Sequence, residues 1–313
     1  MSARFAVAAC MRNEGPFLLE WAAHYLALGF SHLFVITNDC DDGTDLMADR
    51  LSQLIALTHL RNDVPEGGFA QVEGMALLKG SGHLDAVDWL LHCDADELLY
   101  LQMPDPDIGR FVAGLPECDA VAFDWRFVGT DLDAWPGGLL VDHCPMGSSG
   151  AGKPESFSKT LFRPELFESF SDHMPKFPSR EVRVLNSRGE PLPSGAMSHP
   201  NKSRYIRGSS DHLGWERAEM RHYALRSKDV FAVKALRGFG INPRVGKYRV
   251  GSRFWREADR RDMVLDRNPL WYQRLTDQIA DLMRDAEIAR LQTNALAVLR
   301  EKRRLLEEAP PEG

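Results

Sequence analysis

Short apolar runs and amphipathic segments alternate along the N-terminal third of the chain, and this alternation restricts the possible folds more than any other feature. Apolar runs of strand length that alternate with helical segments are typical of repeated βα units. We therefore expect an α/β fold, with a mostly parallel sheet flanked by helices. The predicted strands cover residues 5–10, 33–37, 55–60 and 89–93, and the predicted helices cover residues 16–28, 46–54 and 69–79.

The pattern becomes less regular after residue 101. One more strand is predicted over residues 121–127, and a stretch rich in Gly, Pro and Ser over residues 135–154 is predicted to be a mobile loop. The chain then becomes mostly helical near its C-terminus. We therefore expect one α/β domain over residues 1–240 and a mainly helical C-terminal extension over residues 241–313.

The charge of the chain restricts its partners. The 313 residues carry a formal net charge of −7, whereas a protein that coats nucleic acid or an anionic membrane needs a basic surface. We expect no nucleic-acid partner, and an anionic substrate would have to be met locally by a cation or a metal. No apolar run approaches the length of a membrane span, so we expect no transmembrane segment, while peripheral membrane association stays open.

The cysteines indicate the compartment. There are five of them, an odd number, and none forms a Cys-x-x-Cys pair. This usage is typical of reduced thiols and not of a disulfide framework. We therefore expect a cytoplasmic protein.

Polar clusters follow three of the predicted strands. Residues 11–14 follow the first strand, residues 38–42 the second, and residues 94–97 the fourth. Parallel strands end at the same edge of a sheet, and ligands bind outside those carboxyl ends. We expect the three clusters to form one site.

Asp94 and Asp96 lie two residues apart where an apolar strand ends. In an extended chain both carboxylates project to the same side. Such a pair can hold one Mg²⁺ or Mn²⁺ ion, which prefers oxygen ligands and shares its remaining positions with water and phosphate. The alternative is a pair of solvated acids, one of which caps a following helix.

Five motifs in this order resemble the glycosyltransferases of the GT-A fold, specifically family 2-like and family 92-like enzymes. The motifs are the loops at residues 12–14 and 38–39, the Asp-x-Asp at 94–96, the segment SKTLFRPELF followed by Asp172-His173, and the block RHYALRSKDVFAVKALRG. They span about residues 4–240. The resemblance implies a GT-A domain, a nucleotide-sugar donor that carries UDP, a Mn²⁺ or Mg²⁺ cofactor and transfer with inversion.

The resemblance also implies roles for individual residues. The implied nucleotide-binding residues are Arg12, Asn13, Glu14, Asn38, Asp39 and Asp94, and the implied metal-binding residues are Asp94, Asp96 and His222. Arg226, Lys234 and Arg237 could compensate phosphate charge. The segment 227–237 is also typical of an amphipathic helix with a solvated basic face, and we favour that interpretation for Lys234 and Arg237.

The chain departs from the family 2 pattern in two places. The second-strand loop begins Asn38-Asp39 where the family has Asp-Asp, and the acidic motif that supplies the catalytic base is not visible. Asp124, inside a predicted strand, and Asp131, on the loop after it, are the alternatives for the base. We favour Asp131, because a loop acid after a strand faces a binding cleft more often than a mid-strand acid. Trp125 and Phe127 could stack on a sugar, but core positions are the favoured interpretation.

Three other patterns carry no functional prediction. Residues 147–153 fit the GxxxxGK of a phosphate-binding loop, but Pro154 replaces the Ser or Thr that would bind magnesium. The adjacent His and Cys residues at 92–93 and 143–144 lack the spacing and further ligands of a zinc site. His199 and His212 lie in polar turns that could contact an acceptor or phosphate.

Together these features predict a metal-dependent glycosyltransferase that moves a sugar from a UDP-sugar to a hydroxyl of a glycan or lipid-linked acceptor. Two alternatives stay open at this point. One is another nucleotide-using, metal-dependent transferase such as a nucleotidyltransferase. The other is a protein of the same fold that binds a nucleotide or glycan without turnover.

Overall fold

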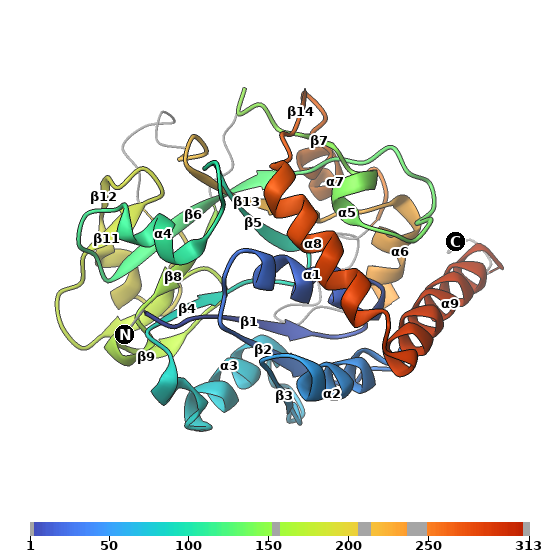
Figure 1. Ribbon diagram of the computed structural model, residues 1–313, viewed down its shortest axis with the longest axis horizontal. Coiled ribbons are helices and arrows are strands. Elements are labelled where there is room, and N and C mark those ends of the chain that lie inside the picture. Colours follow the sequence, from blue (N-terminus) through green and yellow to red (C-terminus); the bar gives the residue numbers. More distant parts are fainter. Residues whose placement is uncertain (1–2, 152–156, 206–213, 237–248, 309–313) are drawn as a thin grey trace.

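The computed structural model describes residues 3–151, 157–205, 214–236 and 249–308. Its centre is a mixed sheet with the strand order β12-β11-β6-β8-β4-β1-β2-β3, and β13 and β5 extend it beside β6. The predicted fold class, a mostly parallel sheet flanked by helices and followed by C-terminal helices, is confirmed (Figure 1).

The N-terminal half is the predicted βα series. Strand β1 pairs in parallel with β2 on one side and with β4 on the other, and β2 pairs in parallel with β3. Each predicted element of this half is found within about three residues of its expected limits. The strands are β1 (Phe5–Met11), β2 (His32–Thr37), β3 (Leu57–Arg61) and β4 (Trp89–His92), and the helical elements are α1 (Gly15–Ala27), α2 (Thr44–Leu54), α3 (Ala70–Gly80) and η1 (His83–Ala86).

The second half of the sheet brings distant segments to the same edge. Strand β8 (Ser158–Phe162) runs antiparallel between β4 and β6 (Ala120–Phe127). Strand β13 (Ala218–His222) pairs in parallel with β6 and antiparallel with β5 (Glu97–Leu101). Strands β1, β2, β4, β6 and β13 therefore point the same way, so their carboxyl ends lie at one edge of the sheet.

Shorter elements complete this half. Strand β6 also pairs with β11, which pairs with β12, and two small sheets join β9 to β10 and β7 to β14. Their bounds are α4 (Ile108–Ala113), α5 (Leu140–His143), β7 (Met146–Gly147), η2 (Pro164–Leu166), β9 (Phe167–Phe170), β10 (Pro175–Pro178), β11 (Val184–Asn186), β12 (Pro191–Leu192), η3 (Ser194–Ser198), α6 (Lys228–Leu236), α7 (Arg253–Ala258) and β14 (Met263–Val264).

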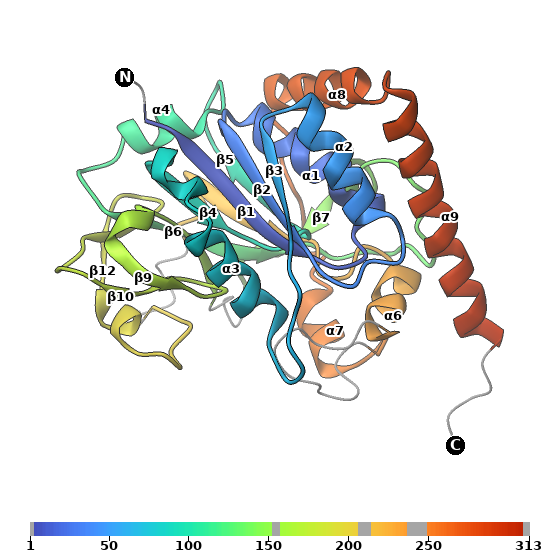
Figure 2. The same ribbon diagram turned by 90° about the horizontal axis from the view of Figure 1, so that it is seen from below.

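The alternation of side chains along β1 divides the core into two layers. Val7 and Ala9 belong to one buried cluster with residues of α1 and α2, whereas Ala6 and Ala8 belong to another with residues of α3 and β9. This is the arrangement expected when successive side chains of a strand point to opposite faces. Figure 2 shows α1 and α2 on one side of the sheet and α3 on the other.

The C-terminal helices pack on the α1 side of the sheet. Figures 1 and 2 show α8 (Pro269–Leu282) beside α1 and α9 (Ala286–Glu308) beside α2. Helix α8 buries Trp271 and Leu275, and α9 buries Ile288 and Leu291, all in the cluster that contains residues of α1. These helices thus share a core with the N-terminal half. The predicted boundary at residue 240 lies outside the described residues.

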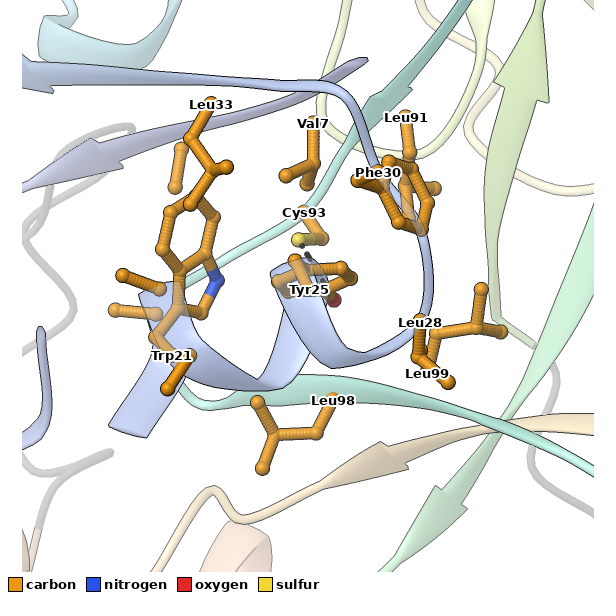
Figure 3. Packing of buried hydrophobic residues seen from close by; sticks show 14 of the residues in the cluster. Val7, Trp21, Tyr25, Leu28, Phe30, Leu33, Leu91, Cys93, Leu98 and Leu99 are labelled. Atoms are coloured by element: carbon orange, nitrogen blue, oxygen red, sulfur yellow. Dashed lines mark hydrogen bonds between the residues drawn. The ribbon is translucent and has the colours of Figure 1, made fainter. Parts of the chain in front are cut away.

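Figure 3 shows how α1 is attached to the end of β4. Tyr25 is fully buried, and its hydroxyl hydrogen-bonds with the thiol of Cys93 (3.2 Å) and donates to the carbonyl oxygen of Glu97 (2.9 Å). Leu98 and Leu99 pack beside the ring, and Trp21 lies one turn earlier on the helix. The aromatic face of α1 therefore holds the turn that carries the Asp-x-Asp motif.

The segment predicted to be a mobile loop is largely packed, so that prediction was wrong for residues 135–147. Trp135 and Leu140 are buried in the main core. The backbone N–H of Leu140 donates to the Glu20 carboxylate of α1 (2.7 Å), and burial raises the pKa of Glu20 to about 7. A loop rich in Gly and Pro can still be ordered when its few apolar residues reach the core. Residues 152–154 of the former prediction lie outside the described residues.

Two other expectations concern the whole chain. All five cysteines are free thiols, as predicted. Among the described helices, none combines the length and the apolar character needed to cross a bilayer.

Candidate active site at the carboxyl edge of the sheet

The loop after β1 is held in place by the loop after β2. Asn13 has a φ of 56°, a left-handed conformation that Asn tolerates better than most residues, and its side-chain oxygen accepts from the backbone N–H of Asp41 (2.9 Å). The backbone N–H of Glu14 donates to the hydroxyl of Thr44 (2.9 Å). Arg12, by contrast, is exposed. The first two polar clusters therefore form one structure, as their positions predicted.

The acids of the second loop divide into an exposed one and a structural one. Asp39 has a φ of 46°, is exposed, and accepts from the side-chain amide of Asn38 (3.0 Å). Asp42 is buried and accepts from the backbone N–H groups of Gly15 (3.0 Å) and Thr44 (2.9 Å), at the starts of α1 and α2. Asp42 thus supports the loops, while Asp39 stays accessible to a ligand.

Each carboxylate oxygen of Asp94 accepts from one protein donor. Its two oxygens accept from the side-chain amide of Gln71 (2.7 Å) and from the ammonium of Lys159 (3.1 Å). Lys159 is fully buried and also lies 3.1 Å from a carboxylate oxygen of Glu97. Burial alone would raise the pKa of Asp94, but the Lys159 charge outweighs it and lowers that pKa.

Asp96, the second acid of the motif, lies against a lysine and a histidine. One oxygen accepts from Lys234 (2.5 Å), and the other lies 3.7 Å from Nε2 of His222. Burial would raise the pKa of Asp96, but Lys234 and His222 outweigh it and hold that pKa well below its usual value. Two predicted metal ligands, more than a hundred residues apart in the sequence, are thus neighbours.

Lys234 does not lie on a solvated helix face, so that interpretation was wrong. It is buried, with 9% of its surface exposed, and its ammonium also donates to the carbonyl oxygen of Ala224 (3.0 Å). Helical periodicity could not reveal this, because the partner Asp96 comes from another part of the chain. Arg237 lies outside the described residues.

Arg226 joins the late block to the first loop. It is 1% exposed, has a φ of 60°, donates to a Glu14 carboxylate oxygen (2.5 Å) and stacks over the ring of Phe17 (3.8 Å). Its Nε and Nη2 have no hydrogen-bond acceptor among the described residues. The guanidinium also helps to lower the pKa of Asp96. A buried cation with unused donors beside the acidic motif is suited to an anionic ligand.

His222 ends β13 inside an aromatic setting. Its ring lies 4.2 Å from the ring of Trp125 and stacks on Phe127 at 5.4 Å. Burial lowers the pKa of His222, which favours the neutral ring that binds metals. Trp125 is buried, as the core interpretation predicted, while Phe127 is half-buried and borders the site.

The two acids considered for the catalytic base lie in different surroundings. Asp124 is 1% exposed and accepts from the hydroxyl of Ser158 (2.7 Å) and the backbone N–H of Gly214 (3.1 Å), which marks a structural role. Asp131 is exposed on the loop after β6. Within the described part of the chain, no hydrogen bond or ion pair links Asp131 to the acidic motif, and its catalytic role stays a prediction.

Four residues around the acidic motif were given no role of their own from the sequence. Lys159 and Glu97 form the buried pair beneath Asp94, Gln71 reaches it from α3, and Asp172 lies on the turn between β9 and β10. Lys159 and Asp172 stand in motifs of the resemblance, and Glu97 stands in the polar cluster at residues 94–97, but nothing local showed that they meet. Gln71 offered no local signal. His199 is exposed, and His212 lies outside the described residues.

The donor set can be compared with the needs of a divalent cation. Among the described residues, no group of three or more His, Cys, Asp or Glu side chains is arranged as a complete metal site. Mg²⁺, however, is often bound by one or two carboxylates together with substrate phosphates and water. Asp96 and His222 approach within 3.7 Å and fit such an incomplete protein site, whereas both oxygens of Asp94 are engaged.

No protein-family model matches this sequence, and no curated protein sequence is similar to it at a significant level. Solved structures show partial similarity. TarS 1–349 from S. aureus in complex with UDP has a TM-score of 0.36 and 11% identity, over 90% of this chain and 72% of that one. Mannosyl-3-phosphoglycerate synthase from Rubrobacter xylanophilus has a TM-score of 0.33 and 15% identity, over 53% of this chain and 55% of that one.

Proposed function

We propose that this protein is a glycosyltransferase that moves a sugar from a nucleoside diphosphate, UDP, to a hydroxyl of a glycan or lipid-linked acceptor. The observation that carries the proposal is the meeting of buried cations and acids at the carboxyl edge of the sheet. Arg226 and Lys234, from the late block, contact Glu14 and Asp96, from the first loop and the acidic motif. In open α/β sheets this edge is where nucleotides bind.

The nucleoside end of the donor would lie over the first two loops. Asn13 and Asp39 both have left-handed backbones at this edge; Asn13 is buried, and Asp39 is open to solvent. Arg12 and Asn38 flank them. We propose that Asp39 accepts a hydrogen bond from the base or ribose, with Asn13 and Glu14 lining the pocket.

The diphosphate requires positive charge, which this acidic chain must supply locally. Arg226 has two N–H groups without an acceptor among the described residues, and the Lys234 ammonium lies within a hydrogen bond of Asp96. Lys234, whose side chain is 11% exposed, would hold the phosphate oxygens, and the buried charge of Arg226 would add to the positive potential that stabilises the departing diphosphate. We therefore propose that Arg226 and Lys234 compensate the charge of the phosphates, a role that the sequence alone left open.

A divalent cation belongs to the proposal as well. Asp96 and His222 are the residues that would hold Mn²⁺ or Mg²⁺. When bound there, the cation supplies Lewis-acid stabilisation of the leaving phosphate. We further propose that transfer inverts the anomeric configuration, as the resemblance implies.

The proposal is tested by calorimetric titration of UDP into the full chain with Mn²⁺ and again with EDTA. We expect binding with Mn²⁺ and a loss of affinity of about tenfold or more in EDTA, equal to about 1.4 kcal/mol. Asp96→Asn and Lys234→Met should each weaken binding by a similar factor. The matched control is Asp85→Asn, an exposed residue of η1 at the opposite end of β4, which should bind as the wild type does.

The outcomes separate the alternatives. If UDP does not bind under either condition, the nucleotide site is refuted. If UDP binds but no UDP-sugar is consumed, with or without glycan acceptors, the protein is a nucleotide-binding member of the fold without turnover. Consumption of a sugar phosphate and a nucleoside triphosphate would indicate a nucleotidyltransferase.

A further inference from the structure

Transfer to a hydroxyl needs a group that receives the hydroxyl proton. Most carboxylates near the acidic motif are engaged. Asp94 and Asp96 bind Lys159 and Lys234, and Asp124 accepts two hydrogen bonds from the protein. Glu97 is fully buried beneath Asp94 and cannot reach a substrate.

Asp172 is a further carboxylate at this edge of the sheet. The turn that carries it is fixed on both sides by histidine hydrogen bonds. Nδ1 of His92, the last residue of β4, donates to the carbonyl oxygen of Ser171 (3.2 Å), and Nδ1 of His173 donates to the carbonyl oxygen of Ser158 (3.3 Å), the first residue of β8. The end of β4 and the start of β8 both lie at the carboxyl edge, so Asp172 is held there.

The carboxylate of Asp172 is available for chemistry. It is half-buried, and no hydrogen bond or ion pair joins it to any residue in the described ranges. Lys159 and Asp94 are close enough to act on its charge. Burial raises the pKa of Asp172 to about 6, with Lys159 opposing the shift and Asp94 adding to it. A base with a pKa slightly below neutrality is ionised at pH 7 and still accepts a proton effectively.

A row of rings leads from this turn to the acidic motif. His173 stacks on Phe157 at 4.6 Å and meets the edge of Trp125 at 5.2 Å, and Trp125 lies 4.2 Å from His222. Phe157 is half-buried at the border of the row. Asp172 thus lies at one end of the row, and Asp96 lies near the other.

We infer that Asp172, and not Asp131, is the general base for the acceptor hydroxyl. The inference rests on the proposed function. In the reaction, the hydroxyl proton passes to a carboxylate oxygen of Asp172, and the electron pair of the hydroxyl oxygen forms the new bond to the anomeric carbon. The bond from that carbon to the phosphate oxygen breaks, and its electron pair leaves with UDP.

The test uses water as the acceptor, and measures release of UDP from UDP-N-acetylglucosamine and from UDP-glucose by the full chain. Asp172→Asn should bind UDP within about twofold of the wild-type affinity and release UDP about a hundredfold more slowly, in the range typical of a lost general base. Asp172→Glu should recover part of the rate. The control Asp85→Asn should match the wild type.

The pH profile distinguishes a base from a merely structural residue. The wild-type rate should fall as the pH drops through about 6, where Asp172 becomes protonated, and the Asn variant should lack this step. The other titrating groups around Asp172 differ: burial lowers the pKa of His92 to about 4 and of His173 to about 3, and burial raises that of Cys10 far above neutrality. Asp94 ionises below its usual pKa, and its charge is the largest one that opposes the effect of burial and keeps Lys159 protonated.

Several results would overturn the inference. Asp172→Asn could keep the wild-type rate, or Asp131→Asn could lose the rate while Asp172→Asn keeps it. A wild type that binds UDP but releases none from either donor would also overturn the role of Asp172, while the nucleotide site would stand. If the wild type does not bind UDP, the proposed function fails and the inference falls with it.

Discussion

Replacing Glu97 by Gln should stabilise the protein, by an amount that grows with pH. Glu97 is fully buried, and burial raises its pKa from 4.5 to about 8 even though Lys159 opposes the shift. The folded protein therefore holds a proton on Glu97 that the unfolded chain loses above about pH 4.5. Below pH 4.5 Glu97 is protonated in both states, so it does not change the free energy of unfolding. As the pH rises from 4.5 to 8, the unfolded chain releases this proton and the folded protein keeps it, so the wild type loses stability. Gln imitates the protonated acid at every pH.

The size of the effect follows from the pKa shift of Glu97. Each unit of pKa difference corresponds to about 1.4 kcal/mol. The free energy of unfolding of Glu97→Gln should thus exceed that of the wild type by about 1 kcal/mol at pH 5 and about 3 kcal/mol at pH 7. Above pH 8 the difference should level off near about 5 kcal/mol.

Urea unfolding of both proteins at pH 5, 6, 7 and 8 measures this difference. Glu66→Gln, in an exposed loop, is the control and should change the free energy of unfolding by less than about 0.5 kcal/mol at each pH. A difference that shrinks or reverses as the pH rises would refute the reasoning. It would show that the Lys159 charge outweighs burial and keeps Glu97 ionised.

Two further predictions concern the attachment of the helices. Tyr25→Phe removes the donor to the Glu97 carbonyl oxygen and should lower the free energy of unfolding by about 1 kcal/mol in urea, with near-native circular dichroism; an unchanged midpoint would contradict the role given to this hydrogen bond. Trp271→Ala empties a fully buried position between α8 and α1 and should lower the free energy of unfolding by about 3–5 kcal/mol, measured as a lower thermal midpoint. The control Leu270→Ala, at an exposed position, should change the thermal midpoint little. A small effect of Trp271→Ala would mean that the C-terminal helices are not part of the main core.

Much of the fold could be predicted because its signals are local. The alternation of apolar and amphipathic segments identified every strand and α-helix from Phe5 to His92, but not the short helix η1, and the polar residues after those strands identified the edge where the loops meet. The loop at residues 135–147 was misjudged from its composition. Its order depends on Trp135 and Leu140 reaching a core built by α1, which composition alone does not describe.

The acidic residues of the candidate site were predicted from the sequence, but the basic residues that pair with them were not. Asp94, Asp96 and His222 were named from the sequence, and Asp96 and His222 do meet. Lys234 was assigned to a solvated helix face, and Lys159 and Asp172 were quoted within motifs but given no role. Each of these three depends on which strand lies beside which, and β8 and β13 enter the sheet out of sequence order.

The amino-acid sequence by itself determined the βα series and the polar loops at the strand ends, because periodicity and turn residues act over a few positions. The tertiary structure alone decided which charges meet. Arg226 binds Glu14 across 212 residues of sequence, and Lys234 binds Asp96 across 138. The physical reason is that burying an ammonium or guanidinium requires a partner at hydrogen-bond distance, and only the folded sheet brings such partners together.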